Sequence, residues 1–103
     1  TKGAGTCHWM APEVPSGKYD EKADVFSYAM VLFEIICREI PFEEAEGREA
    51  VGLVMQGVRP DMEAVPPDRP EKLEQLMVAC WSHKAGQRPN FQEICNILKS
   101  VKL

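Results

Sequence analysis

Residues 23–37 read Ala-Asp-Val-Phe-Ser-Tyr-Ala-Met-Val-Leu-Phe-Glu-Ile-Ile-Cys, and this stretch decides the fold class. Asp20 precedes it with a side chain suited to an N-cap, so we predict one helix over residues 21–38. The apolar residues occupy nearly the whole circumference of that helix instead of a single stripe. A helix that is apolar on all sides is a buried helix. The sequence therefore predicts a central helix that other elements surround.

Three further helical patterns follow the central helix. Residues 48–56 are apolar on one side and precede Gly57, which suits a left-handed helix cap. Pro70 fits the first turn of the next helix, whose apolar residues are spaced i, i+3, i+4, i+7 and i+8: Leu73, Leu76, Met77, Cys80 and Trp81. Asn90 and Glu93 have capping-box spacing for the last helix. Its expected buried stripe comprises Phe91, Ile94, Cys95, Leu98 and Val101. We therefore predict an all-α fold of four helices with no sheet.

The composition narrows the class of protein. A chain of 103 residues with 45% hydrophobic residues makes one small domain or part of a larger one. The formal net charge of −4 and the scattered basic residues disfavour a nucleic-acid partner, because phosphate backbones are bound by Lys- and Arg-rich faces. The longest apolar run is well short of the roughly 20 residues that span a bilayer, so no membrane partner is predicted.

Four cysteines bear on the questions of metal binding and disulfides: Cys7, Cys37, Cys80 and Cys95. No two of them have Cys-x-x-Cys spacing and no histidine stands at ligand spacing from them, so no metal site is predicted. Three lie in apolar helical patterns, where a free cysteine behaves as a small hydrophobe. We therefore expect reduced thiols and a cytoplasmic protein.

Two short motifs near the ends of the chain carry a resemblance to a known family. Residues 5–13 read Gly-Thr-Cys-His-Trp-Met-Ala-Pro-Glu, and residues 87–89 read Gln-Arg-Pro. Asp-Val-Phe-Ser-Tyr, Ile-Pro-Phe and Cys-Trp stand between them, at residues 24–28, 40–42 and 80–81. In this order, the motifs resemble the large lobe of a protein kinase from the end of the activation segment to the last helix. The combination is similar to the tyrosine-kinase-like group of serine/threonine kinases.

The resemblance implies a partial protein-kinase domain over residues 1–103. Residues 1–16 would be the substrate-docking loop and the Ala-Pro-Glu segment, residues 21–38 the central buried helix, and residues 39–103 the C-terminal helices. The parent domain would use ATP and Mg²⁺ to phosphorylate a protein substrate. Residues 1–103 contain no Gly-rich loop, His-Arg-Asp motif or Asp-Phe-Gly motif. We therefore expect these residues alone to hold no catalytic residue, to bind no nucleotide and to be inactive.

The resemblance also implies a substrate-binding loop near the start of the chain. The Thr6 hydroxyl would hold the catalytic loop and the substrate hydroxyl in register. Cys7, Trp9 and Met10 would line the pocket for the residue after the phosphoacceptor. Trp9 and Met10 fit an ordinary core equally well, so both readings stay open.

The remaining site residues follow from the same resemblance. Glu13 and Arg88 would form a buried ion pair that fixes the loop to the last helices. Asp24 would accept backbone N–H bonds from the catalytic loop, or act as a first-turn Asp that stabilises its own helix. Thr1 lies where activating phosphorylation occurs in relatives, and is a candidate phosphosite.

The motifs leave two alternatives to an active kinase. The same motifs fit a non-catalytic pseudokinase or scaffold remnant used for protein binding, whereas an unrelated helical interaction domain is disfavoured by their order.

Three helices are too few to surround the central one on all sides, so we expect Phe26, Met30 and Phe33 to stay partly exposed. The expected partners of such a face are the preceding part of the kinase domain and a second copy of the chain.

Overall fold

The computed structural model describes residues 7–101 and contains four α-helices. They are α1 (Lys22–Cys37), α2 (Gly47–Met55), α3 (Glu71–Cys80) and α4 (Phe91–Lys99). Four short 3-10 turns accompany them: η1 (Cys7–Trp9), η2 (Val14–Ser16), η3 (Met62–Ala64) and η4 (Ala85–Gln87). No strand occurs within residues 7–101, and the predicted all-α fold is confirmed.

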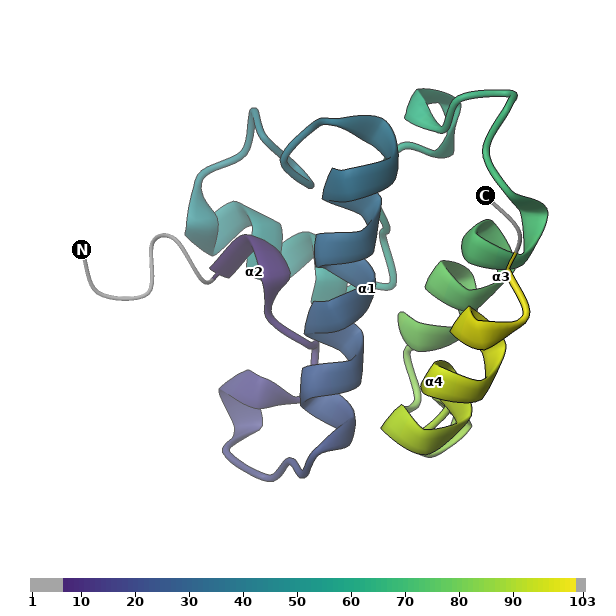
Figure 1. Ribbon diagram of the computed structural model, residues 1–103. Helices are drawn as coiled ribbons and strands as arrows, with labels where there is room; N and C mark the ends of the chain where they lie inside the picture. The colour runs from purple at the N-terminus through teal and green to yellow at the C-terminus, as the bar shows by residue number, and fades with distance from the viewer. Residues whose placement is uncertain (1–6, 102–103) are drawn as a thin grey trace.

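Helix α1 stands at the centre of the molecule, with α2 and η1 on one side and α3 and α4 on the other (Figure 1). The core forms around it, and seven of its residues are buried: Ala23, Val25, Phe26, Ala29, Met30, Leu32 and Phe33. None of the helices in the described part of the chain combines the length and the apolar content needed to cross a bilayer.

The expectation that Phe26, Met30 and Phe33 stay exposed is wrong, because all three are buried. Loop residues cover what the helices do not. The guanidinium groups of Arg59 and Arg88 lie 5.0 and 5.1 Å from the centre of the Phe26 ring. Trp81 directly follows α3, and the centre of its ring lies 6.4 Å from the centre of the Phe33 ring. Loops and turns therefore complete the core around α1.

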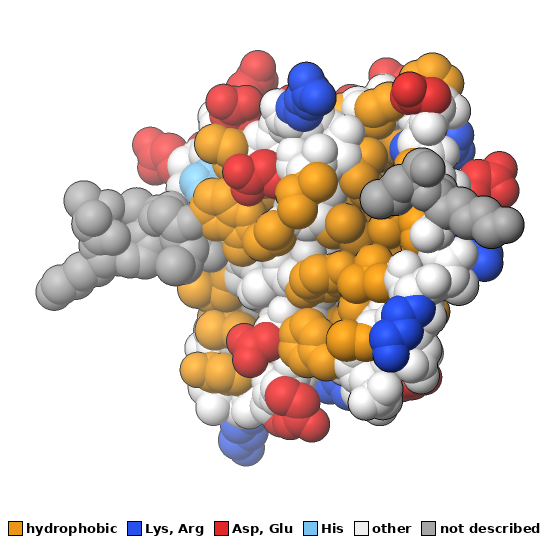
Figure 2. Space-filling model, viewed as in Figure 1, with side chains coloured by type: hydrophobic (Ala, Val, Ile, Leu, Met, Phe, Trp, Pro, Cys, Tyr) orange, Lys and Arg blue, Asp and Glu red, His pale blue; other side chains and the backbone are white. Residues whose placement is uncertain are grey.

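A different part of α1 remains uncovered. Val31 is 43% exposed and Ile35 is 67% exposed. The predicted buried stripe of α4 is also wrong for most of its members: Ile94 is buried, but Phe91, Cys95 and Leu98 are exposed. The rings of Tyr28 in α1 and Phe91 in α4 meet edge to face at 6.2 Å, so the two exposed regions adjoin. Figure 2 shows hydrophobic side chains in a band across this face of the molecule.

Two predicted helix ends are confirmed. Gly57 follows α2 with a φ of 91°, and its amide donates to the carbonyl of Val54 at 3.0 Å. Only glycine adopts this conformation without steric cost. At the start of α4, the side chain of Asn90 accepts from the Glu93 amide at 2.8 Å, and the Glu93 carboxylate accepts from the Asn90 amide at 3.0 Å.

Two other predicted helix starts are displaced by one residue. The N-cap of α1 is Glu21, and the carboxylate of Asp20 accepts from the Lys22 amide at 2.9 Å from one position earlier. Pro70 is the N-cap of α3 rather than part of its first turn. Its ψ of 125° is extended, while its carbonyl already accepts from the Leu73 amide at 3.0 Å.

Candidate functional site

The segment around η1 is fastened to the body of the molecule by side chains. The Ser27 hydroxyl in α1 donates to the Trp9 carbonyl at 2.7 Å. The Trp9 indole N–H donates to Oε1 of Glu34 at 3.1 Å. Because Ser27 and Glu34 are seven residues apart, they lie on the same face of α1, two turns from each other. Trp9 is therefore held at its backbone and at its ring by one helix.

A third contact reaches the turn after α1. Nε2–H of His8 donates to the carbonyl of Ala45 at 2.8 Å. The rings of His8 and Trp9 also meet edge to face, with centroids 5.9 Å apart. The half-buried His8 thus links η1 to a part of the chain 37 residues away.

Glu13 and Arg88 form a bidentate ion pair 75 residues apart in the sequence. Nη1 of Arg88 lies 2.7 Å from Oε2 of Glu13, and Nη2 lies 2.9 Å from Oε1. Nε donates to the Ser82 carbonyl at 2.8 Å, while Nη1 and Nη2 also donate to the carbonyls of Lys22 and His83 at 2.8 and 3.3 Å. All five guanidinium N–H donors therefore have an acceptor.

Through this pair, the loop that ends at Glu13 is joined to Arg88 in the loop before α4, and Arg88 also bonds to Lys22 at the start of α1. Arg88 is only 2% exposed, so its charge is neutralised inside the molecule. The hydrogen bonds from Arg88 lower the pKa of the Glu13 carboxyl below its ordinary value, which keeps it ionised. Nζ of Lys22 donates to the Arg88 carbonyl at 2.6 Å and ties the same two segments together again. We name the Glu13–Arg88 pair with these bonds the clasp.

The predicted site residues other than Glu13 and Arg88 do not form one cluster. Cys7, Trp9 and Met10 are half-buried and adjoin one another in or next to η1. Asp24 lies in the first turn of α1, is exposed, and makes no side-chain hydrogen bond within residues 7–101. Thr1 and Thr6 lie outside the described residues.

Several residues that hold the η1 segment could not be predicted from the sequence. Ser27, Glu34 and His8 reach the η1 segment, but a polar residue on a helix or loop carries no sign of its acceptor. Arg59 was also missed. It donates from Nε to the Trp81 carbonyl at 2.8 Å, and burial lowers its pKa. The one available signal was the spacing of Ser27 and Glu34 on a single face of α1.

The contacts around η1 fix one loop at several points. Within the described range, no set of three or more His, Cys, Asp or Glu side chains is placed to hold a metal ion. The site consists instead of a loop whose backbone and aromatic side chain are fixed at several points.

Comparisons with known proteins give one consistent result. The profile of the family described as protein tyrosine and serine/threonine kinase matches residues 1–98. The serine/threonine-protein kinases STY17 and STY46 of Arabidopsis thaliana are each 43% identical over 103 residues, which cover 98% of this chain. Human mitogen-activated protein kinase kinase kinase 7 is 41% identical over 101 residues and 95% of this chain. The matched region is 18%, 17% and 16% of these three relatives, so the chain spans about a sixth of their length.

Proposed function

The chain belongs to the protein tyrosine and serine/threonine kinase family, and from this premise we propose that residues 1–103 form the C-terminal part of a serine/threonine kinase large lobe. Residues 1–16 serve as the substrate-docking loop with the Ala-Pro-Glu segment. Residues 21–38 are the central helix, and residues 39–103 complete the helical foundation. The whole protein transfers the γ-phosphoryl group of ATP, with Mg²⁺, to a hydroxyl of a protein substrate.

The observation that carries this proposal is the clasp. A substrate loop must hold its shape, because an error of about 1 Å in placement can cost 100-fold in rate. Glu13 ends the loop, and Arg88 fixes that end to the helical foundation through a charged fork with no unused donor. The bonds from Ser27 and Glu34 fix the middle of the same loop at Trp9.

Roles for the remaining residues follow from the loop. Cys7, Trp9 and Met10 are only half-buried, so part of each side chain is available to a substrate residue. We assign to Thr6 the contact with the catalytic loop and the substrate hydroxyl, and to Thr1 the role of phosphosite. The exposed carboxylate of Asp24 is free to accept backbone N–H groups from the catalytic loop of the complete domain.

Residues 1–103 on their own contain none of the motifs that hold ATP in this family. We therefore expect them to bind no nucleotide. Calorimetric titration of the chain with Mg-ATP measures this directly. Saturable binding in the micromolar range would contradict the proposal that residues 1–103 contain no ATP site.

The kinase role is tested in the complete domain that contains these residues. Arg88→Ala should lower kcat/KM toward a protein substrate by about 10–100-fold, although Arg88 touches no substrate. Arg88→Lys keeps the charge but loses the fork, so it should recover only part of the activity. Arg69→Ala removes a partly exposed ion pair with Glu74 and is the matched control.

The outcome also separates an enzyme from a scaffold. Wild-type kcat/KM in Arg88→Ala would overturn the role of the clasp. A complete domain that binds a protein but transfers no phosphoryl group would favour the pseudokinase or scaffold alternative.

Partners and location complete the proposal. The uncovered face of α1 and α4 is covered by the rest of the kinase domain in the whole protein, and by a second copy when residues 1–103 stand alone. The four cysteines are free thiols in the structure, which suits the reducing cytoplasm.

A further inference from the structure

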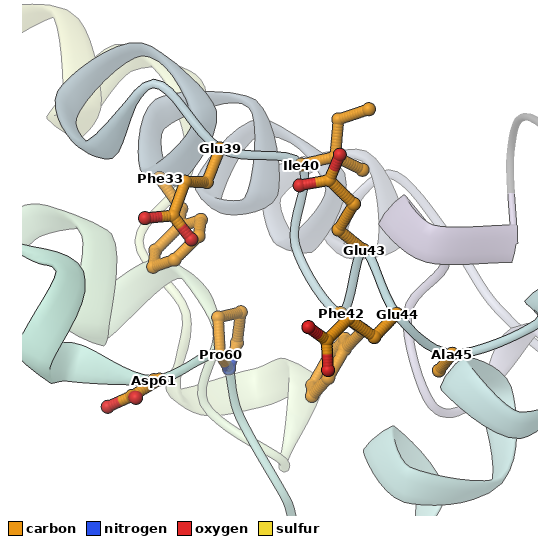
Figure 3. A pocket seen from close by; sticks show the side chains of 9 residues that line it. All are labelled: Phe33, Glu39, Ile40, Phe42, Glu43, Glu44, Ala45, Pro60 and Asp61. Carbon is orange, nitrogen blue, oxygen red and sulfur yellow. The ribbon is translucent and has the colours of Figure 1, made fainter.

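A cavity of about 410 Å³ lies near the end of α1, beside the Ala45 carbonyl that accepts from His8. Figure 3 shows the residues that line it, which belong to three segments of the chain. Phe33 and Glu39 come from the end of α1 and the residues after it, and Pro60 and Asp61 from the segment after α2. The turn between the two helices contributes the rest: Ile40, Phe42, Glu43, Glu44 and Ala45.

The lining combines apolar side chains with an acidic rim. Phe33 and Pro60 are buried and Phe42 is half-buried, whereas the four acidic residues are exposed: Glu39, Glu43, Glu44 and Asp61. No Lys or Arg lines the cavity. Within residues 7–101 the only ion pairs are Arg69–Glu74 and Arg88–Glu13, so no Lys or Arg of these residues forms an ion pair with the four carboxylates.

The backbone at the cavity is held in an uncommon conformation. Phe42 has a φ of 54°, in the left-handed region that a bulky residue rarely adopts. Its carbonyl accepts from the Ala45 amide at 2.9 Å, and the Ala45 carbonyl accepts from His8. The turn that carries Glu43 and Glu44 is therefore braced at both sides. Strained residues of this kind cluster at binding sites.

We propose that this cavity binds an arginine side chain from an extended segment of a partner protein. The alkyl stem of arginine packs on apolar surface while its charged head stays at the rim. Its planar guanidinium stacks on an aromatic face and donates to carboxylates in a fork, a combination that matches the half-buried Phe42 and the four acidic residues. The acidic rim repels nucleic acid. The volume suits one or two side chains of a peptide.

The inference is independent of the proposed kinase function and is tested on the chain itself. The probe is the peptide acetyl-Gly-Arg-Leu-Arg-Gly-amide, and binding is followed by two-dimensional ¹H–¹⁵N NMR at low salt. The expected result is a saturable shift of the amides of Phe33, Ile40, Phe42 and Ala45, with weakening as salt is raised because charge pairs at a surface are screened. Shifts spread over the whole surface, or none at these amides, would overturn the proposal.

Matched variants identify the residues that bind. Glu43→Gln with Glu44→Gln should weaken binding by about three- to tenfold, the loss expected for two exposed charge pairs. Glu21→Gln with Glu71→Gln makes the same change in net charge at exposed positions outside the lining, and should leave the affinity unchanged. Equal weakening by both double variants would show general charge attraction and overturn the site.

Two further probes decide the chemistry of the occupant. Replacing both arginines of the peptide by lysines should weaken binding, because an ammonium group cannot stack or form the fork. Spermine should bind more weakly than the arginine peptide. If the lysine peptide or spermine binds as tightly as the arginine peptide, the cavity recognises positive charge alone and the assignment to arginine is wrong.

Discussion

The two faces of α1 carry similar residues but differ in what covers them. On one face Phe26, Met30 and Phe33 are sealed by loops, by Trp81 and by the two arginines beside the Phe26 ring. On the other, Val31 and Ile35 meet solvent beside the exposed side chains of α4. The covered face thus has its packing partners within residues 7–101, whereas no part of residues 7–101 covers Val31 and Ile35 on the open face. Removing contacts should therefore be costly on the first face and nearly free on the second.

The largest effect is expected at the clasp, which seals the covered face. Arg88→Ala breaks a buried ion pair and should lower the free energy of unfolding of the chain by about 3–5 kcal/mol. The side chains of Arg88 and Glu13 are 0% and 21% exposed, against 28% and 27% for Arg69 and Glu74. Arg69→Ala should therefore cost at most about 1 kcal/mol.

Urea denaturation followed by circular dichroism measures both variants. Equal losses of stability in Arg88→Ala and Arg69→Ala would mean that burial does not distinguish the two pairs. A loss confined to Arg88→Ala is the expected result.

The second prediction compares residues of equal size on the two faces. Leu32→Ala empties a covered position and should cost about 2–5 kcal/mol of unfolding free energy. Ile35→Ala removes as many carbon atoms from a side chain that is 67% exposed, so it should change stability by no more than about 0.5 kcal/mol. The same denaturation experiment applies, at protein concentrations low enough to suppress association. A large cost for Ile35→Ala would show that the open face is covered in solution.

Much of the covered face could be predicted from the sequence. The four helices follow from apolar periodicity, and Gly57 and Asn90 mark helix ends by local backbone chemistry alone. The pairing of Glu13 with Arg88 followed from the family resemblance, since no local rule joins residues 75 positions apart.

Contacts between distant segments were not predictable from the sequence. The number of helices alone predicts that Phe26, Met30 and Phe33 are exposed, whereas Arg59 covers the Phe26 ring and Trp81 packs against the Phe33 ring from outside the helices. The stripe of α4 looked buried because periodicity shows which side is apolar, but not whether a neighbour faces it. His8 and the acidic cavity had no sequence signal, because their contacts depend on how distant segments meet.

A third prediction concerns pH and the clasp. The pKa of Glu13 in the folded chain is lowered from its ordinary value of 4.5, chiefly by the hydrogen bonds from Arg88. The carboxylate therefore contributes its full stabilisation above about pH 4.5, and loses it as the pH falls through the lower pKa of the folded state. Glu13→Gln lacks this titration. The stability difference between wild type and Glu13→Gln, measured in urea, should shrink between pH 5 and pH 3, and a constant difference would contradict it.

The smallest change in stability is expected from a charge placed on the open face, and its effect should appear in association instead. Ile35→Lys leaves a mostly exposed position exposed, so the folding of a single chain should be nearly unaffected. Burying an isoleucine between two copies contributes roughly 1.5–3 kcal/mol, which corresponds to about tenfold or more in the association constant. Sedimentation velocity with dye binding should show that wild type self-associates and that Ile35→Lys does so at least about tenfold less. Met55→Lys is the matched control, because Met55 is also exposed but belongs to α2, on the other side of α1. If both substitutions weaken association equally, the added charge alone is responsible. If wild type stays monomeric at high concentration without binding dye, the open face needs no cover, and the contrast between the two faces of α1 has no consequence in solution.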